Sequence, residues 1–348
     1  MAVRVEKPAF NLRSKLNELD RPVGTFGNQV LATENRYEAN KLIGGGRKNL
    51  LINGDFKVSQ RGDYTSATAV ADDTYYLDRW KMRKSGSSIT ITHNKNISIT
   101  EAGGDGIKTN SAKIDITTSN NGYWALRQIV EDYAAVSGQT VTFSCWVRGV
   151  GQKVFFRLWG ISNIGHGHAL TEDWQFYTET FSAPAVTGAI DGNNGFVPTI
   201  GNYAEANVYN HTADWCEVAL FQVEVGRSPT PFEFRTETEE LALCQRYYWQ
   251  VNDNKYRRVN GYKRHDTNVH FELQSPVPMR IAPAPTLSDG GIFTNFQGNF
   301  GSTQSNPTIS EWDIDTGKGL LVIESNYSST HLSIPSWEGY QLQLSAEI

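Results

Sequence analysis

The feature that most constrains the fold is a series of short segments between residues 49 and 234 in which apolar and polar residues alternate. In 140–148, every second residue from Val141 to Val147 is apolar, and polar or larger residues stand between them. Such alternation predicts a strand with one buried side and one solvent-facing side. The strands predicted in this way are Ile89–His93, Ser111–Thr117, Tyr123–Val130, Thr140–Arg148, Val154–Trp159, Gln175–Ser182 and Trp215–Val225. Turn residues separate them at spacings typical of a sandwich or jelly roll.

The rest of the chain divides around this β region, so a mainly β protein with four parts is predicted. Residues 1–48 form a short helical head with Leu12, Leu16 and Leu19 at helical spacing, and a second helical pattern there contains Tyr37. Residues 49–234 form the jelly-roll β-sandwich. Residues 235–250 form a linker helix that starts with a capping box of Thr236 and Glu239. Residues 251–348 form a small C-terminal β domain.

Charge and composition exclude several classes of protein. The formal net charge of -5 argues against nucleic-acid binding, which needs a concentrated basic face. No run approaches the ~18 apolar residues of a membrane span, and the first residues lack a secretory signal, so synthesis in the cytoplasm without membrane insertion is expected. The three cysteines (Cys145, Cys216 and Cys244) include no CxxC pair and are expected to be buried thiols.

Residues 1–48 have a different charge from the rest of the chain. They hold nine Lys/Arg against five Asp/Glu, a net of +4, on a chain that is acidic as a whole. Two short helices cannot bury a core of their own, so they must pack on another surface. This favours a segment that docks onto another protein, with Leu12, Leu16, Leu19 and Tyr37 as candidate docking residues, although ordinary scatter of charge explains the pattern equally well.

Aromatic and arginine side chains mark the candidate binding site. The glycine-rich link at 149–152 predicts a hairpin between 140–148 and 154–159, which would place their solvent-facing residues side by side. Those residues are Trp146, Arg148, Phe155, Arg157 and Trp159, and Tyr203 and Tyr209 in a nearby loop could extend the set. Trp80, Trp124 and Trp174 lie in strand-like segments and are expected mainly in the core. Aromatic planes stack on sugar rings, and arginines would suit anionic sugars. The alternative is that another segment or a sister chain covers this face.

The sequence contains no complete catalytic or metal-binding motif. GxSxG, HExxH and phosphate-loop patterns are all missing, and His166 and His168 have no convincing further ligands. A pair of carboxylates for glycoside hydrolysis can never be excluded in a chain with 37 Asp and Glu residues. We therefore expect a protein that is not an enzyme.

Several short motifs resemble those of bacteriophage tail-fibre and virion structural proteins. They are the segments Asn49–Phe56, Gln60–Gly62, Tyr76–Trp80, Ser228–Arg235, Glu239–Tyr248, Pro278–Arg280 and Gln343–Ile348. The strands Gly138–Trp146 and Trp174–Tyr177 are similar to those of carbohydrate-binding jelly rolls.

This resemblance implies a homotrimeric fibre or receptor-binding protein on the tail or capsid surface of a virion. The N-terminus would attach to other virion proteins, the C-terminal domain would trimerise, and the jelly roll would bind host-surface polysaccharide or lipopolysaccharide. A non-adhesive capsid decoration, head fibre or tail adaptor is the alternative, and a polysaccharide depolymerase is a lesser one. No cofactor is implied except a structural calcium ion, for which Asp55 is a weak candidate.

Overall fold

The structure is a computed structural model. It describes residues 49–100, 106–118, 122–131, 136–151, 153–159, 165–183, 196–202, 212–251, 261–265, 268–287, 293–295, 298–300, 308–324, 336–337 and 342–347. Residues 49–348 form one compact unit. The predicted head at 1–48, with Leu12, Leu16, Leu19 and Tyr37, lies outside the described residues.

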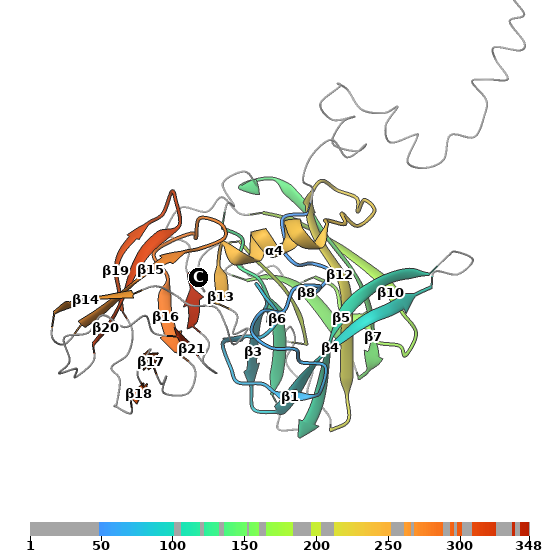
Figure 1. The fold of residues 1–348 in the computed structure, drawn as a ribbon. Coiled ribbons are helices and arrows are strands. Elements are labelled where there is room, and N and C mark those ends of the chain that lie inside the picture. The colour runs from blue at the N-terminus through green and yellow to red at the C-terminus, as the bar shows by residue number, and fades with distance from the viewer. Residues whose placement is uncertain are drawn as a thin grey trace, which may run out of the picture. The chain divides into compact units, whose positions relative to one another are not determined.

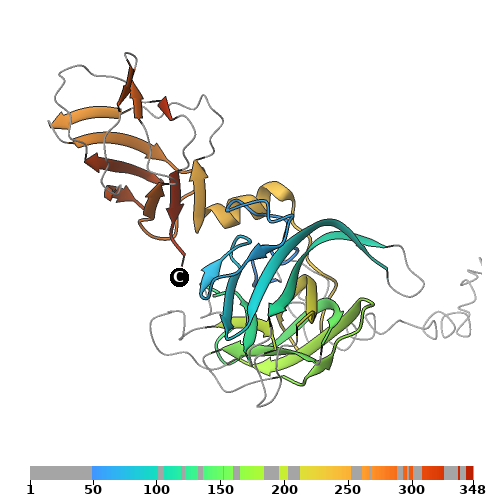
Figure 2. The same ribbon diagram turned by 90° about the horizontal axis from the view of Figure 1, so that it is seen from below.

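Two six-stranded antiparallel sheets form a β-sandwich (Figures 1 and 2). Sheet A has the order β1-β4-β5-β12-β7-β10, with bounds Thr68–Ala69, Ser88–Ile99, Ile107–Thr118, Trp215–Val225, Thr140–Val150 and Gln175–Ser182. Sheet B has the order β2-β3-β6-β11-β8-β9, with bounds Thr74–Tyr75, Lys81–Ser85, Tyr123–Arg127, Val197–Gly201, Lys153–Trp159 and His168–Ala169. The prediction of a mainly β protein built on a sandwich is confirmed.

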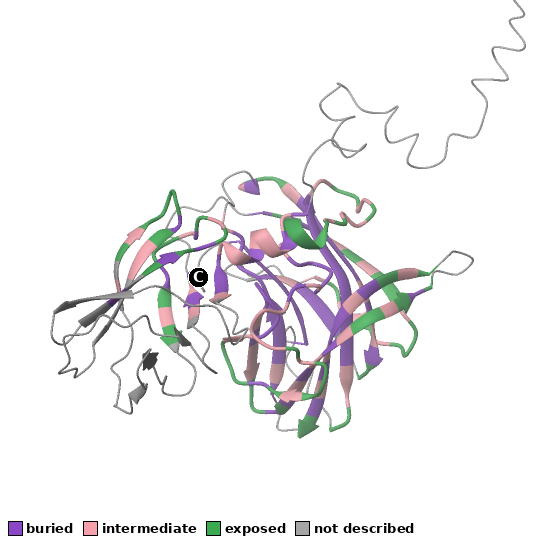
Figure 3. Cartoon of the chain, viewed as in Figure 1, coloured by how far each residue is buried: buried purple, intermediate pink, exposed green. Residues whose placement is uncertain are grey.

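Apolar side chains from both sheets share one core, which Figure 3 shows as buried stretches along the strands. The residues of β7 that were predicted to face the core are all fully buried: Val141, Phe143, Cys145 and Val147. Phe143 of sheet A lies 6.0 Å from Phe156 of sheet B, and Trp80 stacks on Phe221 at 5.5 Å, both between ring centroids. Burial of each such side chain contributes about 1.5–3 kcal/mol to the free energy of unfolding.

All three cysteines are buried and free, as predicted. Burial raises the pKa of the Cys145, Cys216 and Cys244 thiols. Because the thiolate is the reactive form, these residues act as small apolar side chains.

The predicted hairpin between β7 and β8 is wrong, because the two strands belong to different sheets. β7 pairs with β10 and β12, whereas β8 pairs with β9 and β11. A Cβ atom on Gly149 would lie 2.2 Å from the carbonyl oxygen of Trp215, and Gly151 has a φ of +149°. Glycine tolerates both conditions and lets the chain pass from one sheet to the other. The crossing also buries Phe143 and Phe156 against each other, which pairing within a single sheet would not do.

The segment after β12 folds back over part of the outer side of sheet A. Gln222 and Glu224 point outward from β12, yet both are buried. Glu224 accepts hydrogen bonds from the backbone amide and hydroxyl of Thr230, each at 2.7 Å. Gln222 donates to the Thr230 carbonyl at 3.1 Å and accepts from the Glu233 amide at 2.8 Å. Phe232 of the same segment packs against a small cluster on this side of the sheet that also includes Trp146 and Trp174.

Helix α4 (Glu237–Gln245) follows and has the predicted capping box of Thr236 and Glu239, but it ends before the predicted residue 250 because the chain enters a strand at Tyr248. No helix within the described ranges is long and apolar enough to cross a membrane. After it, β13 (Tyr248–Val251), β22 (Leu342–Ser345) and β16 (Ala284–Leu287) form a three-stranded sheet in that order.

Two further small sheets complete the described C-terminal part. One has the order β14-β15-β20-β19, with bounds Gly261–His265, Asn268–Gln274, Lys318–Glu324 and Thr308–Asp313. The other has the order β18-β17-β21, with bounds Gly298–Phe300, Phe293–Asn295 and Ser336–Trp337. A β-rich C-terminal region is thus confirmed, whereas its role in trimerisation stays a prediction.

A buried ionic cluster joins the sandwich to the segments around α4 and β22. Arg79 is 1% exposed, forms an ion pair with Glu347 and lies 3.5 Å from the ring centroid of Tyr247. Arg61 forms ion pairs with Asp78 at 3.0 Å and with Glu347 at 3.2 Å. Burial raises the pKa of Asp78, and the nearby Arg61 opposes that rise. The motifs that contain these residues therefore supply contacts within the protein itself.

Candidate functional site

The part of the outer side of sheet A that lies next to this segment is the candidate site. We call it the aromatic face and define it by Lys113, Trp146, Arg148, Trp174, Phe176 and Trp215. Strand register brings these residues together: Phe176 of β10 lies opposite Trp146 of β7, and Lys113 of β5 lies opposite Glu217 of β12. Glu217 in turn lies opposite Arg148 of β7.

Aromatic rings surround the Arg148 guanidinium group on this face. Its Cζ atom lies 4.9 Å from the ring centroid of Trp174 and 5.8 Å from that of Trp215. The rings of Trp146 and Phe176 are 5.4 Å apart. The three indoles are half-buried, and Phe176 is 44% exposed. The face therefore offers several aromatic planes on a rigid sheet, beside a hydrogen-bond donor.

A buried carboxylate fixes the position of Arg148. Glu217 is fully buried and accepts hydrogen bonds from the Ser111 hydroxyl at 2.5 Å and the Asn94 amide at 2.7 Å. Its Oε2 atom lies 2.7 Å from both Nε and Nη2 of Arg148. A guanidinium group held by two contacts to one carboxylate keeps its orientation, so the planes around it are preorganised.

The structure separates the five residues that the predicted hairpin would have placed together. Trp146 and Arg148 lie on the aromatic face, but Phe155 and Arg157 lie on β8 in sheet B. Phe155 is 1% exposed and Arg157 is half-buried. Trp159 is the last residue of the same strand of sheet B, and its side chain is not among those that the structure describes. The prediction of one continuous face is therefore wrong for these three residues.

The two loop tyrosines predicted to extend the site, Tyr203 and Tyr209, lie outside the described residues. Their contribution to a binding site stays a prediction.

Sequence reasoning missed Trp174, Phe176 and Trp215. Trp174 was expected in the core, together with Trp80 and Trp124, and only the last two are buried. Trp174 and Phe176 are two residues apart, at the spacing that puts both on one side of a strand. Trp215 alternates in the same way with the buried Cys216. The alternation of these residues was thus visible in the sequence. Deciding which side of the strand faces the core required knowing which strands pair with it.

Asp55, the calcium candidate, has a cationic partner instead. Its carboxylate lies 2.7 Å from the ammonium group of Lys57 and is almost completely buried. In the part of the chain that the structure describes, no group of three or more His, Cys, Asp or Glu side chains is placed to hold a metal ion. Calcium is also bound by backbone and amide carbonyl oxygens, so a role of Asp55 as a calcium ligand stays a prediction.

His166 and His168 both face Glu179 rather than a set of metal ligands. The Nδ1 atom of His166 lies 3.1 Å from Glu179, and the Nε2 atom of His168 lies 3.8 Å from it. Burial lowers the pKa of His168, whose ring stacks on Tyr177 with centroids 4.4 Å apart. This arrangement is an edge contact between β9 and β10, the neighbouring edges of the two sheets.

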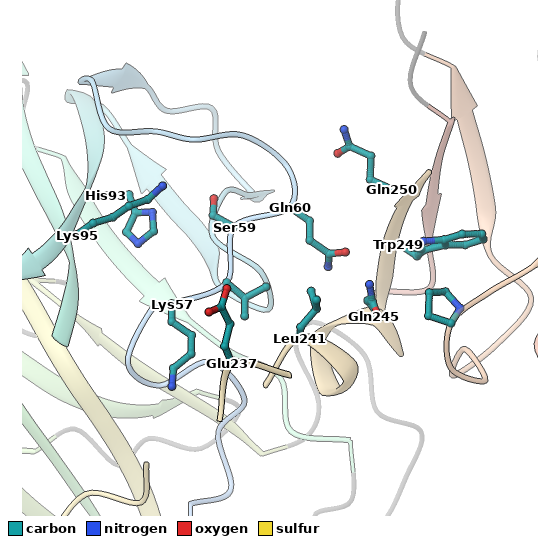
Figure 4. A pocket seen from close by; sticks show the side chains of 12 residues that line it. Lys57, Ser59, Gln60, His93, Lys95, Glu237, Leu241, Gln245, Trp249 and Gln250 are labelled. Carbon is teal, nitrogen blue, oxygen red and sulfur yellow. The ribbon is translucent and has the colours of Figure 1, made fainter. Parts of the chain in front are cut away.

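A separate pocket of about 590 Å³ lies beside helix α4 (Figure 4). Its lining includes Trp249, His93 and the glutamines Gln60, Gln245 and Gln250. Gln60 already donates to Asp78 and to the Tyr248 carbonyl, each at 2.9 Å, and Gln250 accepts from the Tyr248 hydroxyl at 3.2 Å. Much of the polar lining of this pocket is therefore already hydrogen-bonded within the protein. The aromatic face is for this reason the better candidate for a ligand-binding site.

His93 gives a testable pH dependence of stability. Its side chain is buried, and burial, followed by the charge of Lys95, lowers its pKa. The folded state then binds a proton less readily than the unfolded state, so this contribution to stability is present above about pH 6.5 and is lost as the pH falls. We expect His93→Gln to flatten the fall in thermal midpoint between pH 7.5 and pH 5. A folded His93→Gln variant with the same slope as the wild type would contradict this assignment.

Comparison with known proteins finds solved structures with a similar fold but no family with a similar sequence. No protein-family model and no curated protein matches the sequence. Among solved structures, the enzymatically active domain of tailspike protein 4 of bacteriophage CBA120 matches with a TM-score of 0.30 and 11% identity over 51% of this chain, which corresponds to 21% of the tailspike chain.

Two carbohydrate-associated modules match over nearly their whole length. TmCBM61, solved with beta-1,4-galactotriose, has a TM-score of 0.25 and 13% identity, covering 52% of this chain and 100% of the module. The family 11 carbohydrate-binding module of a cellulosomal cellulase of Clostridium thermocellum has a TM-score of 0.26 and 12% identity, covering 48% and 99%. The protein thus has distant structural similarity to carbohydrate-binding β-sandwich modules and to a phage tailspike domain.

Proposed function

We propose that the protein binds a glycan on the aromatic face without modifying it. The observation that carries the proposal is the placement of Trp174 and Trp215 beside Arg148, with the Trp146–Phe176 pair on the same side of the sheet. A sugar ring has apolar C–H faces that pack on an aromatic plane and hydroxyl groups that need hydrogen-bond partners. Indoles and a fixed guanidinium group supply both, and aromatic and arginine side chains are enriched where binding energy concentrates.

The proposed setting is the surface of a phage particle, and the motif resemblance described above supports it. In this setting the chain would be a trimeric fibre or receptor-binding protein attached through residues 1–48. Weak binding at each copy would be strengthened by about 10²–10⁴ if several copies engage one cell surface together. The alternative is a decoration or adaptor protein in which the same aromatic face packs against another virion protein.

Binding of the full chain to an array of bacterial surface polysaccharides tests the proposal. We expect saturable binding to a subset of glycans, with competition by the same polysaccharide in solution. A folded, oligomeric sample that binds no glycan would overturn the proposal and favour the decoration or adaptor. Immunogold labelling of particles with an antibody against the aromatic face would then ask whether that face is exposed after assembly.

The absence of catalysis is tested on the same glycans. We expect no increase in reducing ends or in soluble fragments after prolonged incubation with the bound polysaccharides. Release of oligosaccharides would instead identify a depolymerase, and a carboxylate pair would then have to be sought by substitution.

A further inference from the structure

Each described cation on the aromatic face has its own carboxylate partner. Arg148 is held by Glu217, with two nitrogens at 2.7 Å from the same oxygen. Lys113 is held by Asp115 at 2.5 Å. The sequence predicted that the arginines of this face would suit anionic sugars. In the structure each positive charge on the face is neutralised by a neighbouring carboxylate, so the face does not attract anions through its net charge.

The Arg148 pair is also costly to open. The Glu217 side chain is 1% exposed, whereas that of Arg148 is 35% exposed. If an anionic sugar drew Arg148 away, Glu217 would remain buried with only the neutral Ser111 and Asn94 as partners. An uncompensated buried charge is strongly unfavourable, so Arg148 is not available as a counter-ion.

The remaining hydrogen-bonding capacity of Arg148 suits an uncharged ligand. Nε and Nη2 contact Glu217, and no hydrogen bond joins Nη1 to any residue within the described ranges. Two N–H donors are therefore free for ring or exocyclic hydroxyl oxygens. The guanidinium group lies near both the Trp174 and the Trp215 rings, so it forms part of the binding surface itself.

We propose that the aromatic face selects uncharged sugar residues, and that Glu217 sets this selectivity by neutralising Arg148 from beneath. This inference rests on the proposed glycan binding and adds the class of glycan. It makes a specific prediction: Glu217→Gln keeps an oxygen for the hydrogen bonds of Ser111, Asn94 or Arg148 but releases one positive charge onto the face.

The test compares the full-length wild type, Glu217→Gln and Asp63→Asn on dextran sulfate and on unmodified dextran columns in a salt gradient. Asp63→Asn removes a carboxylate from an exposed pair with Lys95, and neither residue is a member of the aromatic face, so both variants change the formal net charge by the same unit. We expect Glu217→Gln to bind dextran sulfate about tenfold or more tightly than either other protein, with the gain lost at high salt. Equal retention of the two variants would overturn the proposal.

A second variant covers the case in which Glu217→Gln fails to fold. Asp115→Asn frees Lys113 at a half-exposed pair on the same face, and a smaller gain in binding to dextran sulfate is expected.

On the polysaccharide array, the wild type should bind neutral chains in preference to uronate-, sialate- or sulfate-bearing ones. Binding to acidic chains alone would overturn the selectivity while leaving glycan binding intact, whereas binding to none would overturn the proposed function itself.

Discussion

Replacing Trp174 with alanine is expected to weaken glycan binding by about thirtyfold or more. The indole is half-buried, lies 4.9 Å from the Arg148 guanidinium group and provides one of the planes on which a sugar ring would pack. Truncation of a central aromatic residue typically costs about 2 kcal/mol or more of binding free energy. The dissociation constant for the best glycan on the array, measured by calorimetry for wild type and variant, checks this value.

Ile314→Ala is the matched control for that experiment. Ile314 is 48% exposed in the turn between β19 and β20, which belong to a different sheet from the aromatic face. Its replacement should leave glycan affinity unchanged. If Trp174→Ala is folded and binds as tightly as wild type, the aromatic face does not bind the glycan.

Replacing Glu347 with alanine is expected to lower the free energy of unfolding by about 3–5 kcal/mol, because it leaves a buried cation without its partner. Glu347 is 6% exposed and pairs with both Arg79 and Arg61. Arg61 retains Asp78, but no other carboxylate pairs with the 1% exposed Arg79 among the described residues. Urea denaturation followed by tryptophan fluorescence measures the loss.

Two variants sharpen the Glu347 experiment. Glu347→Gln keeps hydrogen-bond acceptance and should lose less stability than the alanine variant. Asp63→Ala removes the carboxylate of the exposed pair with Lys95 and should change stability little, since exposed pairs are screened by solvent. Equal midpoints for wild type and Glu347→Ala would show that this cluster does not stabilise the fold.

The strands themselves were predictable from local pattern. Gln175–Ser182 and Trp215–Val225 have the predicted bounds, because alternation and flanking turn residues are properties of the segment alone. The capping box of α4 is likewise a short-range signal. These elements required no knowledge of which strands pair.

The site was only partly predictable, because a face is made by strands that are distant in the sequence. Trp146 and Arg148 were identified from alternation, but Glu217 reaches them through pairing of β12 with β7. Phe155 was assigned to the same face because a short glycine-rich link is typical of a hairpin. The link instead connects the two sheets. Whether such a link forms a hairpin or a crossing depends on how both strands are buried in the common core, which the link itself does not determine.

The strand order of sheet A also has a consequence for folding kinetics. β4 and β5 are neighbours in sequence and can pair early, whereas the central strand β12 must pair with both β5 and β7 across intervening chain. Contacts of such large sequence separation carry a loop-closure cost and slow the search for the native state. Until β12 arrives, β5 and β7 have unpaired edges that can pair with other chains. We therefore expect refolding at high protein concentration to lose yield to aggregation, and the arrival of β12 to limit its rate.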